Sequence, residues 1–424
     1  MRVLWITNTP IAKHREMLGL SLGQSGGWME ATYSALKNSP GFTFGVATIY
    51  LGTDFQKSND LHHTFFLVPS DKVITEYDPE SEKNQALWQK VINEFQPDII
   101  QLWGTEFVHG LCALRVAHGI PSVAYIQGMM SQIANHALGE LSFRDRFAST
   151  TLSDLVKKKT YKKELSAYQH RAENERIILS MVDGVIVEND WCAENCRIIS
   201  NNIQVFKSLL PINTLFINHH WSMDQMKPYT IFTTAGPTPI KGHHMLLKAL
   251  NLVVKRFPKT QLLIPGENYY FEHSFARSLK RHSYAKHLLS LCKKYQLDSH
   301  VHYLGKLTPD QMAENMQKCN VFAMPSAIEN HSSTLIEAMM VGAPSVASNV
   351  GGVSEYVVQG ENGFLYRYDE PEMLAAYIIR IFSDTQLARA LSNAAQESMK
   401  QRVSSVDLNK DYSNIYKQLI SDAK

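Results

Sequence analysis

The chain has 424 residues, which is too long for one ordinary hydrophobic core and suits two domains of about 200 residues each. Apolar residues make up 44% of the sequence and charged residues 19%, proportions that exclude an intrinsically disordered protein. The formal net charge is only +2, which excludes a general nucleic-acid-binding protein, because contacts to phosphates need many clustered Lys and Arg residues.

The chain begins with an apolar run, Val3–Thr7, that is too short for the core of a signal peptide and predicts a first strand. No run of about 18 apolar residues follows, so we expect no membrane-spanning helix. Cys192 and Cys196 are four residues apart, but no second Cys or His pair lies near them to complete a zinc site. These features predict a cytosolic protein with reduced thiols and no bound metal.

Short β-branched runs alternate with helical patterns through the first half of the chain. Strands are expected at 3–7, 44–51, 64–68, 98–102, 122–126 and 184–187, and helices at 27–36, 82–94, 108–117 and 171–181. The strand runs are almost continuously apolar, as in a parallel sheet that is covered on both faces. This alternation predicts a doubly wound α/β domain.

Residues 141–169 interrupt that alternation with a basic and aromatic segment. Phe143, Arg144, Arg146 and Phe147 are followed by two lysine clusters at 157–159 and 162–163. Such an insertion is compatible with a solvated helix face. It is also compatible with peripheral membrane contact through residues 144–163, or with binding of a phosphorylated acceptor.

A second alternation starts near Tyr229. It predicts strands at 231–235, 261–264, 301–304, 321–324 and 345–347, a helix at 245–257, and terminal helices at 386–399 and 408–420. Pro211 in segment 207–212 marks the expected hinge. We therefore predict two Rossmann-like doubly wound parallel-sheet domains, 1–210 and 211–400, with a cleft between them and with residues 401–424 crossing back to the first domain.

The segment from Pro325 to Pro344 carries the strongest chemical signal, because it joins a buried strand to a helix. Ser332 is a suitable N-cap, which leaves the amides of Ser333, Thr334 and Leu335 without helical partners and favours an anion such as a diphosphate. Glu329 precedes this site and Glu337 follows it, and a carboxylate can accept hydrogen bonds from sugar hydroxyls. Without the strand-loop-helix context, two glutamates at this spacing would be ordinary surface residues.

Two further segments have the pattern of phosphate-binding loops. Thr233–Gly242 directly follows an expected strand, and its Lys241 can supply a positive charge to a phosphate. Gly26 and Gly27 open the first long helix, where glycine lets the backbone approach a phosphate closely, although such a pair is also typical of a simple turn.

Taken together, these residues resemble glycosyltransferase family 4, a retaining family with the GT-B fold, and the resemblance is strongest over 231–366. The E-x7-E signature of the family matches Glu329 and Glu337, its lysine-glycine motif matches Lys241, and its glycine-rich loop matches Gly26 and Gly27. The stretches 343–348, 351–355 and 360–365 are also similar to the family. Several motifs in the right order are more specific than any one of them.

The resemblance implies a role for each matched residue. Lys241 and the amides of Ser333, Thr334 and Leu335 would hold the diphosphate, Glu337 the ribose hydroxyls and Glu329 the donor sugar. The nucleotide-sugar donor would bind the C-terminal domain and a glycan or lipid-linked acceptor the N-terminal domain. The reaction would proceed with retention, without a metal or another cofactor, because Lys241 and the helix N-terminus neutralise the leaving diphosphate.

Two positions depart from the family pattern. Gly236 stands where an arginine often precedes the lysine by five residues, so one phosphate contact is missing. Gln127 stands where a histidine usually ends the fifth strand, and glutamine can bind a hydroxyl but cannot titrate. Glu106 and His109, one strand earlier, are candidates to compensate on the acceptor side, although a histidine at a helix start is often only a satisfied polar residue.

The sequence therefore predicts a retaining glycosyltransferase that moves a sugar from a UDP- or GDP-sugar to a glycan or lipid-linked acceptor in the synthesis of a bacterial surface polysaccharide. Two alternatives stay open: a nucleotide-sugar epimerase of the same fold, and an inactive scaffold that keeps the binding domain. A nicotinamide dehydrogenase is excluded because no G-x-G-x-x-G follows the first strand. A phosphorylase would need a much longer chain and a Schiff-base lysine.

Overall fold

The computed structural model describes residues 1–20, 27–157, 159–211, 213–268 and 282–423, and the chain divides into two compact units. Unit 1 comprises Met1–Ser131, Gln169–Pro211 and Ser405–Lys424, and unit 2 comprises Gln132–Tyr168 and Ile212–Ser404. One of the connections lies between Pro211 and Ile212. Residues 132–168, expected in the first domain, belong to unit 2, and 405–424 complete unit 1.

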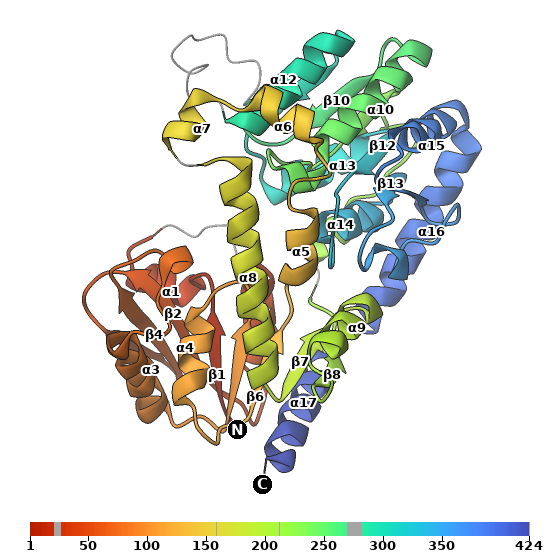
Figure 1. Cartoon of the computed structure of the whole chain (residues 1–424). Helices are drawn as coiled ribbons and strands as arrows, with labels where there is room; N and C mark the ends of the chain where they lie inside the picture. Colours follow the sequence, from red (N-terminus) through yellow and green to blue (C-terminus); the bar gives the residue numbers. More distant parts are fainter. Residues whose placement is uncertain (21–26, 158, 212, 269–281, 424) are drawn as a thin grey trace. The chain divides into compact units, whose positions relative to one another are not determined.

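Unit 1 contains, in its described residues, an eight-stranded sheet of order β3-β4-β2-β1-β5-β6-β7-β8 (Figure 1). All neighbouring strands are parallel except the β3–β4 pair. The strands are β1 (Arg2–Thr7), β2 (Thr43–Leu51), β3 (Gln56–Asp60), β4 (His63–Ser70), β5 (Ile99–Trp103), β6 (Ser122–Tyr125), β7 (Gly184–Val187) and β8 (Gln204–Lys207). The edge strand β3 is polar and the edge strand β8 alternates polar with apolar residues, and neither was predicted from the sequence.

The helices of unit 1 are α1 (Ala12–Met17), α2 (Gly27–Leu36), α3 (Glu82–Phe95), α4 (His109–Val116), α9 (Asp190–Ile199) and α17 (Leu408–Asp422). Helices α5 (Met130–His136) and α8 (Tyr161–Met181) contain the points where the chain passes from one unit to the other. Two apolar clusters fill unit 1. One of them contains Trp5 together with Tyr412 and Tyr416 of α17, so the C-terminal helix is part of this core.

Unit 2 contains, as far as it is described, a six-stranded parallel sheet of order β11-β10-β9-β12-β13-β14. The strands are β9 (Thr230–Phe232), β10 (Gln261–Ile264), β11 (Val301–Tyr303), β12 (Val321–Met324), β13 (Ser345–Ser348) and β14 (Phe364–Tyr366). The helices are α6 (Phe143–Ser149), α7 (Leu152–Val156), α10 (His243–Arg256), α12 (Ser283–Tyr295), α13 (Pro309–Lys318), α14 (Ser333–Val341), α15 (Pro371–Ser383) and α16 (Thr385–Ser404).

Both sheets have a point where the strand order reverses direction. From β1 the chain of unit 1 first adds β2 and β4 on one side and then β5, β6 and β7 on the other. From β9 the chain of unit 2 adds β10 and β11, and then β12, β13 and β14. This is the doubly wound Rossmann order, in which ligands bind at the reversal point beyond the carboxyl ends of the strands. The predicted pair of doubly wound α/β units is confirmed.

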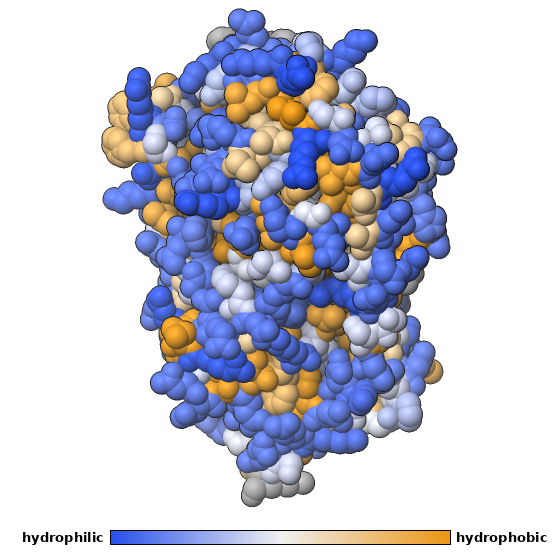
Figure 2. Space-filling model, turned by 90° about the vertical axis from the view of Figure 1, so that its right-hand side faces the viewer, coloured by the Kyte–Doolittle hydropathy of each residue, from blue (hydrophilic) through white to orange (hydrophobic). Residues whose placement is uncertain are grey.

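All five cysteines are buried and free. Hydrophilic residues predominate on the face that Figure 2 shows, and the apolar residues there lie in separate patches. Within the described residues, no helix is long and apolar enough to cross a bilayer.

Candidate functional site

The motifs of unit 2 meet at its reversal point, between the neighbouring strands β9 and β12. The loop 233–242 follows β9, and the loop 325–332 follows β12, so both leave the sheet at the same carboxyl edge. The backbone amide of Ala327 donates to the carbonyl oxygen of Ile240 at 2.7 Å and joins the two loops. The sequence therefore places both motifs where the topology favours a ligand.

Two glycines allow the loop 325–332 to be packed this tightly. Gly242 has φ +65°, and a Cβ atom there would lie 1.6 Å from the carbonyl oxygen of Pro325. Gly351 has φ +53°, and a Cβ atom there would lie 1.9 Å from the carbonyl oxygen of Glu329. A side chain at either position would collide with backbone atoms that cannot move aside. Only glycine therefore allows the backbone segments to approach each other this closely.

Lys241 and Glu329 form the polar centre of this edge. The ammonium Nζ of Lys241 lies 2.6 Å from Oε1 of Glu329, and the hydroxyl of Ser326 donates to the same oxygen at 2.7 Å. The Lys241 side chain is 42% exposed whereas that of Glu329 is 13% exposed, so the cation faces solvent more than its partner does. An anionic ligand can therefore reach Lys241 without unfolding the loops.

The N-terminus of α14 lies in the same place. Ser332 is the N-cap residue in extended conformation, and the amides of Ser333, Thr334 and Leu335 belong to the first turn, which has no intrahelical acceptors for them. The hydroxyl of Thr234, from the loop after β9, donates to the hydroxyl of Thr334 at 3.1 Å. Ser333 is exposed and Thr334 is partly exposed, so an anion can reach the N-terminus of α14. Lys241 lies in the adjoining loop.

Glu337 lies one turn further along α14. Its side chain is partly buried, and burial raises the pKa of its carboxyl group to about 7. A carboxyl group with this pKa is only partly ionised at neutral pH and gains from hydrogen-bond donors that stabilise its charged form. Hydroxyl groups of a bound ligand would supply such donors.

A hydrogen-bonded pair of a histidine and an arginine holds the end of the loop 325–332, and the sequence did not predict it. Nε2 of His331 lies 3.0 Å from a guanidinium nitrogen of Arg402 on α16. Burial, and then the charge of Arg402, lower the pKa of His331 to about 3, so its neutral ring accepts this hydrogen bond. The amide of Ser332 donates to the hydroxyl of Tyr356 at 3.3 Å. These contacts fix the start of α14 from a helix 71 residues away in sequence.

The reversal point of unit 1 lies between β1 and β5 and carries Glu106. Gly104, with φ +92°, leaves room for this carboxylate: a Cβ atom there would lie 1.9 Å from Oε2 of Glu106. Burial raises the pKa of Glu106 to about 7, and the nearby charge of Glu175 adds to the effect, whereas Arg171 and the Asn8 side chain oppose it. Glu106 is therefore a titratable group of unit 1 with its pKa near neutrality, a property common at functional sites.

Glu175 on α8 holds the loops that carry Glu106 and Gln127. Its carboxylate is fully buried and accepts hydrogen bonds from the amides of Met130 at 2.7 Å and Ser131 at 2.8 Å, and from the Thr105 hydroxyl at 3.0 Å. Sequence reasoning missed this residue. The pattern that could have identified it is an acidic residue on the apolar face of a helix, three residues from each of the buried residues Ala172 and Ile178.

The other candidates of unit 1 have different surroundings. Gln127 lies two residues beyond the end of β6 and is partly buried. His109 is buried at the start of α4, its Nε2 atom lies 3.1 Å from the carbonyl oxygen of Thr7, and burial lowers its pKa to about 4. This is the environment of a core histidine. Gly27 is the first residue of α2, and Gly26 lies outside the described residues.

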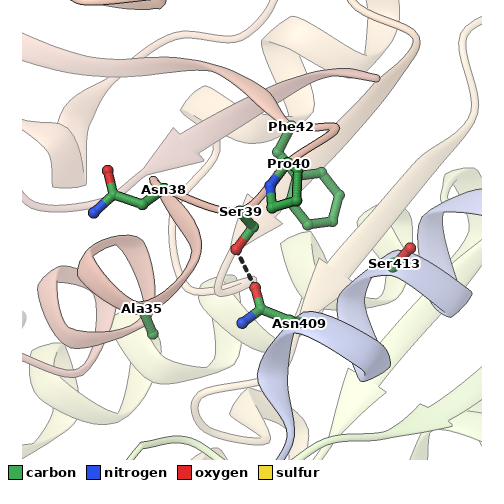
Figure 3. Close-up of a pocket in the computed structure, with 7 residues that line it drawn as sticks. All are labelled: Ala35, Asn38, Ser39, Pro40, Phe42, Asn409 and Ser413. Atoms are coloured by element: carbon green, nitrogen blue, oxygen red, sulfur yellow. Dashed lines mark hydrogen bonds between the residues drawn. The ribbon is translucent and has the colours of Figure 1, made fainter.

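A surface pocket of about 430 Å³ lies at the opposite edge of the unit 1 sheet, before the start of β2 (Figure 3). Its lining joins the end of α2 to α17, and Ser39 donates a hydrogen bond to Asn409 across it. It is far in the topology from the carboxyl ends that carry Glu106 and Gln127. Across the described ranges, no three His, Cys, Asp or Glu side chains come together as a possible metal site.

Comparison with known proteins decides which family these motifs belong to. Residues 221–398 match the family model described as glycosyl transferases group 1. These residues are similar to the group 1 glycosyl transferases. The match includes both glutamates, Lys241 and the whole reversal point of unit 2, and it confirms the family predicted from the motifs.

Individual relatives of the glycosyltransferase domain are distant. The N-acetyl-alpha-D-glucosaminyl L-malate synthase of Bacillus anthracis is 28% identical over 137 residues, which are 32% of this chain and 35% of that protein. The chain thus spans about a third of the length of this curated relative.

Solved structures show the fold over the full length. The sucrose-phosphate synthase of Thermosynechococcus elongatus has a TM-score of 0.71 at 18% identity and covers 100% of both chains. HepE of Anabaena, solved in complex with UDP-glucose, has a TM-score of 0.62 at 18% identity and covers 99% of this chain and 100% of its own. The chain has the predicted GT-B fold of two Rossmann-like domains.

Proposed function

We propose that the chain is a retaining glycosyltransferase that moves a sugar from a nucleoside diphosphate sugar to a hydroxyl group of a glycan or lipid-linked acceptor. One observation carries this proposal. Lys241 and Glu329 are paired beside the N-terminus of α14, within the region that matches the glycosyltransferase family. A cation, a carboxylate and a row of amides are together the groups that a sugar diphosphate needs.

The donor is assigned to unit 2. The amides of Ser333, Thr334 and Leu335 bind the diphosphate together with Lys241, and this ion replaces its contact with Glu329 by contacts with phosphate oxygens. Glu329 then accepts hydrogen bonds from hydroxyls of the transferred sugar, and Glu337 accepts them from the ribose. A UDP-sugar is the first donor to test, because the HepE neighbour was solved with UDP-glucose.

The reaction exchanges one bond at the anomeric carbon for another. The bond to the leaving phosphate oxygen breaks while the acceptor hydroxyl oxygen attacks from the same face, and the hydroxyl proton passes to the departing phosphate. Negative charge grows on the diphosphate in this step, so Lys241 and the helix N-terminus act where they stabilise the transition state. Since these groups supply the positive charge, we expect transfer to continue when a chelator removes divalent cations.

The acceptor is assigned to unit 1, at Glu106 and Gln127. With a pKa of about 7, Glu106 can donate or accept a hydrogen bond at neutral pH, and the Gln127 amide offers both a donor and an acceptor to a hydroxyl. We place the reaction in the cytoplasm and infer a growing bacterial surface glycan as the acceptor class. This last inference rests on the family resemblance.

The test is a ligand screen followed by a turnover assay. UDP, GDP, ADP, CMP and their common sugar conjugates are added to the protein, and thermal unfolding is followed. A ligand at 100 times its dissociation constant stabilises the fold by about 2.7 kcal/mol. We expect one diphosphate family to stabilise the protein and its sugar conjugate to be consumed with an acceptor. A folded protein that no nucleotide stabilises would refute the proposal. Nucleotide binding without any transfer would favour a binding scaffold.

A further inference from the structure

Helices α6 and α7 of unit 2 expose an unusual amount of apolar surface. Their large apolar side chains, here called the apolar patch, are more than half exposed: Phe143 (75%), Phe147 (77%), Leu152 (81%), Leu155 (53%) and Val156 (83%). The five lie within fourteen consecutive residues, and the rings of Phe143 and Phe147 stack on each other at a centroid distance of 6.3 Å. Isolated exposed apolar residues are ordinary, but a cluster of this kind indicates a binding surface.

Two polar side chains of the same segment, Asp154 and Ser149, are buried. Asp154 is buried and accepts hydrogen bonds from the amide of Ser283 at 2.5 Å and from its hydroxyl at 2.6 Å, at the start of α12. Ser149 is buried, and its hydroxyl lies 3.2 Å from that of Tyr161. The segment thus buries two polar side chains while it exposes five large apolar ones, which is the reverse of what an ordinary surface helix does with these residues.

These inward contacts hold the apolar patch in place. Lys286 of α12 donates to the carbonyl oxygen of Thr150, between the two helices, at 3.4 Å, and α6 and α7 lie beside α12 in Figure 1. Turning the apolar side chains inward would break the hydrogen bonds of buried Asp154, which costs more than a surface contact. The buried hydrogen bonds therefore keep the apolar side chains of α6 and α7 exposed.

Positive charge surrounds the apolar patch. Residues 142–163 contain seven basic and two acidic residues. Exposed basic side chains lie on both sides of the patch at Arg144, Lys157, Lys159, Lys162 and Lys163. Of the two acids, Asp154 is buried against Ser283 and Asp145 is hydrogen-bonded to Ser142. The exposed charge of the segment is therefore positive.

We propose that the apolar patch and its basic rim dock on the surface of an anionic bilayer. Amphipathic segments with bulky apolar residues and a Lys- and Arg-rich flank lie in the membrane interface, where the apolar groups enter the acyl boundary and the cations meet headgroups. Helices of seven and five residues are too short to pair with a partner helix over several turns. The proposal concerns this surface alone and does not depend on the transfer reaction.

The experiment is sedimentation of the full chain with vesicles of phosphatidylcholine alone and of phosphatidylcholine mixed with phosphatidylglycerol. We expect binding to the mixed vesicles that weakens with salt, and little binding to the neutral ones. The variant Phe143→Ser/Phe147→Ser/Leu152→Ser should lose binding more than tenfold. Lys162→Gln/Lys163→Gln should lose about fivefold per lysine, since each basic residue near an anionic surface contributes about 1 kcal/mol.

A matched control is available on the same chain. Leu61 and Ile198 are 86% and 84% exposed outside the segment, and Leu61→Ser/Ile198→Ser should leave vesicle binding unchanged. Because all substituted side chains are exposed, the melting temperatures of the variants should stay near that of the original chain. This comparison separates a lost surface from a lost fold.

Three results would overturn the proposal. The first is absence of binding to the mixed vesicles, and the second is equal binding by the original chain and the triple serine variant. The third is a dimer at high protein concentration that the triple variant abolishes, without vesicle binding, because the apolar patch would then be covered by a second copy.

Discussion

Lys241 and Glu329 are 88 residues apart in sequence, yet their side chains form an ion pair of 2.6 Å. The pair neutralises two groups for which the proposed donor has opposite preferences, since a diphosphate attracts the ammonium and repels the carboxylate. Replacing each partner should therefore have a different effect on nucleotide affinity.

Lys241→Ala should weaken binding of the nucleoside diphosphate at least tenfold, because it removes a charge-assisted contact. Glu329→Gln should bind the same diphosphate equally or more tightly, because Lys241 loses its internal competitor, but should lower turnover of the sugar conjugate by two or more orders of magnitude. Calorimetry with the diphosphate and a transfer assay measure the two effects. Lys318→Ala, which breaks an exposed pair with Glu314, is the control. Parallel losses in both variants would contradict the separate roles.

Gly236 occupies the position of an arginine that is common in the family, and there is space for one. No atom lies within 4 Å of a Cβ atom built at Gly236. Gly236→Arg should therefore fold normally and bind the nucleoside diphosphate several-fold more tightly, because a second cation reaches the phosphates. Gly236→Gln gives a neutral side chain of similar length as a control. If the arginine variant binds no better than the glutamine variant, the phosphates lie elsewhere.

Glu337 should contribute to affinity only when the ligand carries ribose hydroxyls. Glu337→Gln removes a charged acceptor, and hydrogen bonds to charged groups are worth about 1.5–3 kcal/mol, so affinity for the ribonucleotide should fall roughly ten- to a hundredfold. Affinity for the 2′,3′-dideoxy nucleotide should not change. A loss of equal size for both ligands would show that the substitution disturbs α14 instead.

Glu106 should make the protein less stable as the pH rises. The carboxyl group has a pKa near 4.5 in the unfolded chain and about 7 in the folded one, so between these values only the folded state keeps the proton. Its contribution is complete below pH 4.5 and is lost as the pH rises through 7, by about 3 kcal/mol at most. Glu106→Gln should therefore gain stability relative to the original chain between pH 5 and pH 8 in urea unfolding.

The exposed Glu82 provides the control for this experiment. The stability difference between Glu82→Gln and the original chain should be the same at pH 5 and pH 8. An unchanged difference for Glu106→Gln as well would mean that its carboxyl group is ionised in the folded protein at both pH values.

Glu175→Ala should destabilise the protein by about 3 kcal/mol, because three buried donors lose their acceptor. Glu175→Gln keeps a carbonyl oxygen and should cost less. Glu173→Ala, on the exposed side of the same helix, should cost under about 0.5 kcal/mol. Urea midpoints measure all three. Similar midpoints for Glu175→Ala and Glu173→Ala would show that the loops around Thr105 and Met130 do not need this acceptor.

The sequence was most informative where chemistry follows a buried strand. The apolar run Val321–Met324 predicts a buried strand. The residues after it must lie at the carboxyl edge of the sheet, so their role in binding could be predicted. The edge strands β3 and β8 lack such a continuous apolar run. Contacts from distant helices, such as Arg402 with His331 or Glu175 with Met130, leave no local pattern at all.

The position of a residue after a strand did not show whether its side chain lies in the candidate site or in the hydrophobic core. His109 follows a strand as Glu106 does, but its ring lies in the core near Trp88. Nothing in its neighbours along the sequence distinguishes the two cases. Residues 143–156 showed their aromatic and basic composition, but only the buried contact of Asp154 with Ser283 reveals which side faces outward.

The dependence of unit 1 on the last residues of the chain has a consequence for its synthesis. The indole nitrogen of Trp5 donates to the hydroxyl of Tyr416 at 3.0 Å, and this hydroxyl donates to Gln101 at 2.6 Å. During translation the sheet of unit 1 leaves the ribosome before α17 does, so its core stays open until α17 has emerged. A gene fragment that ends at Pro211 encodes an unfinished domain, and trimming the C-terminal twenty residues amounts to a core deletion.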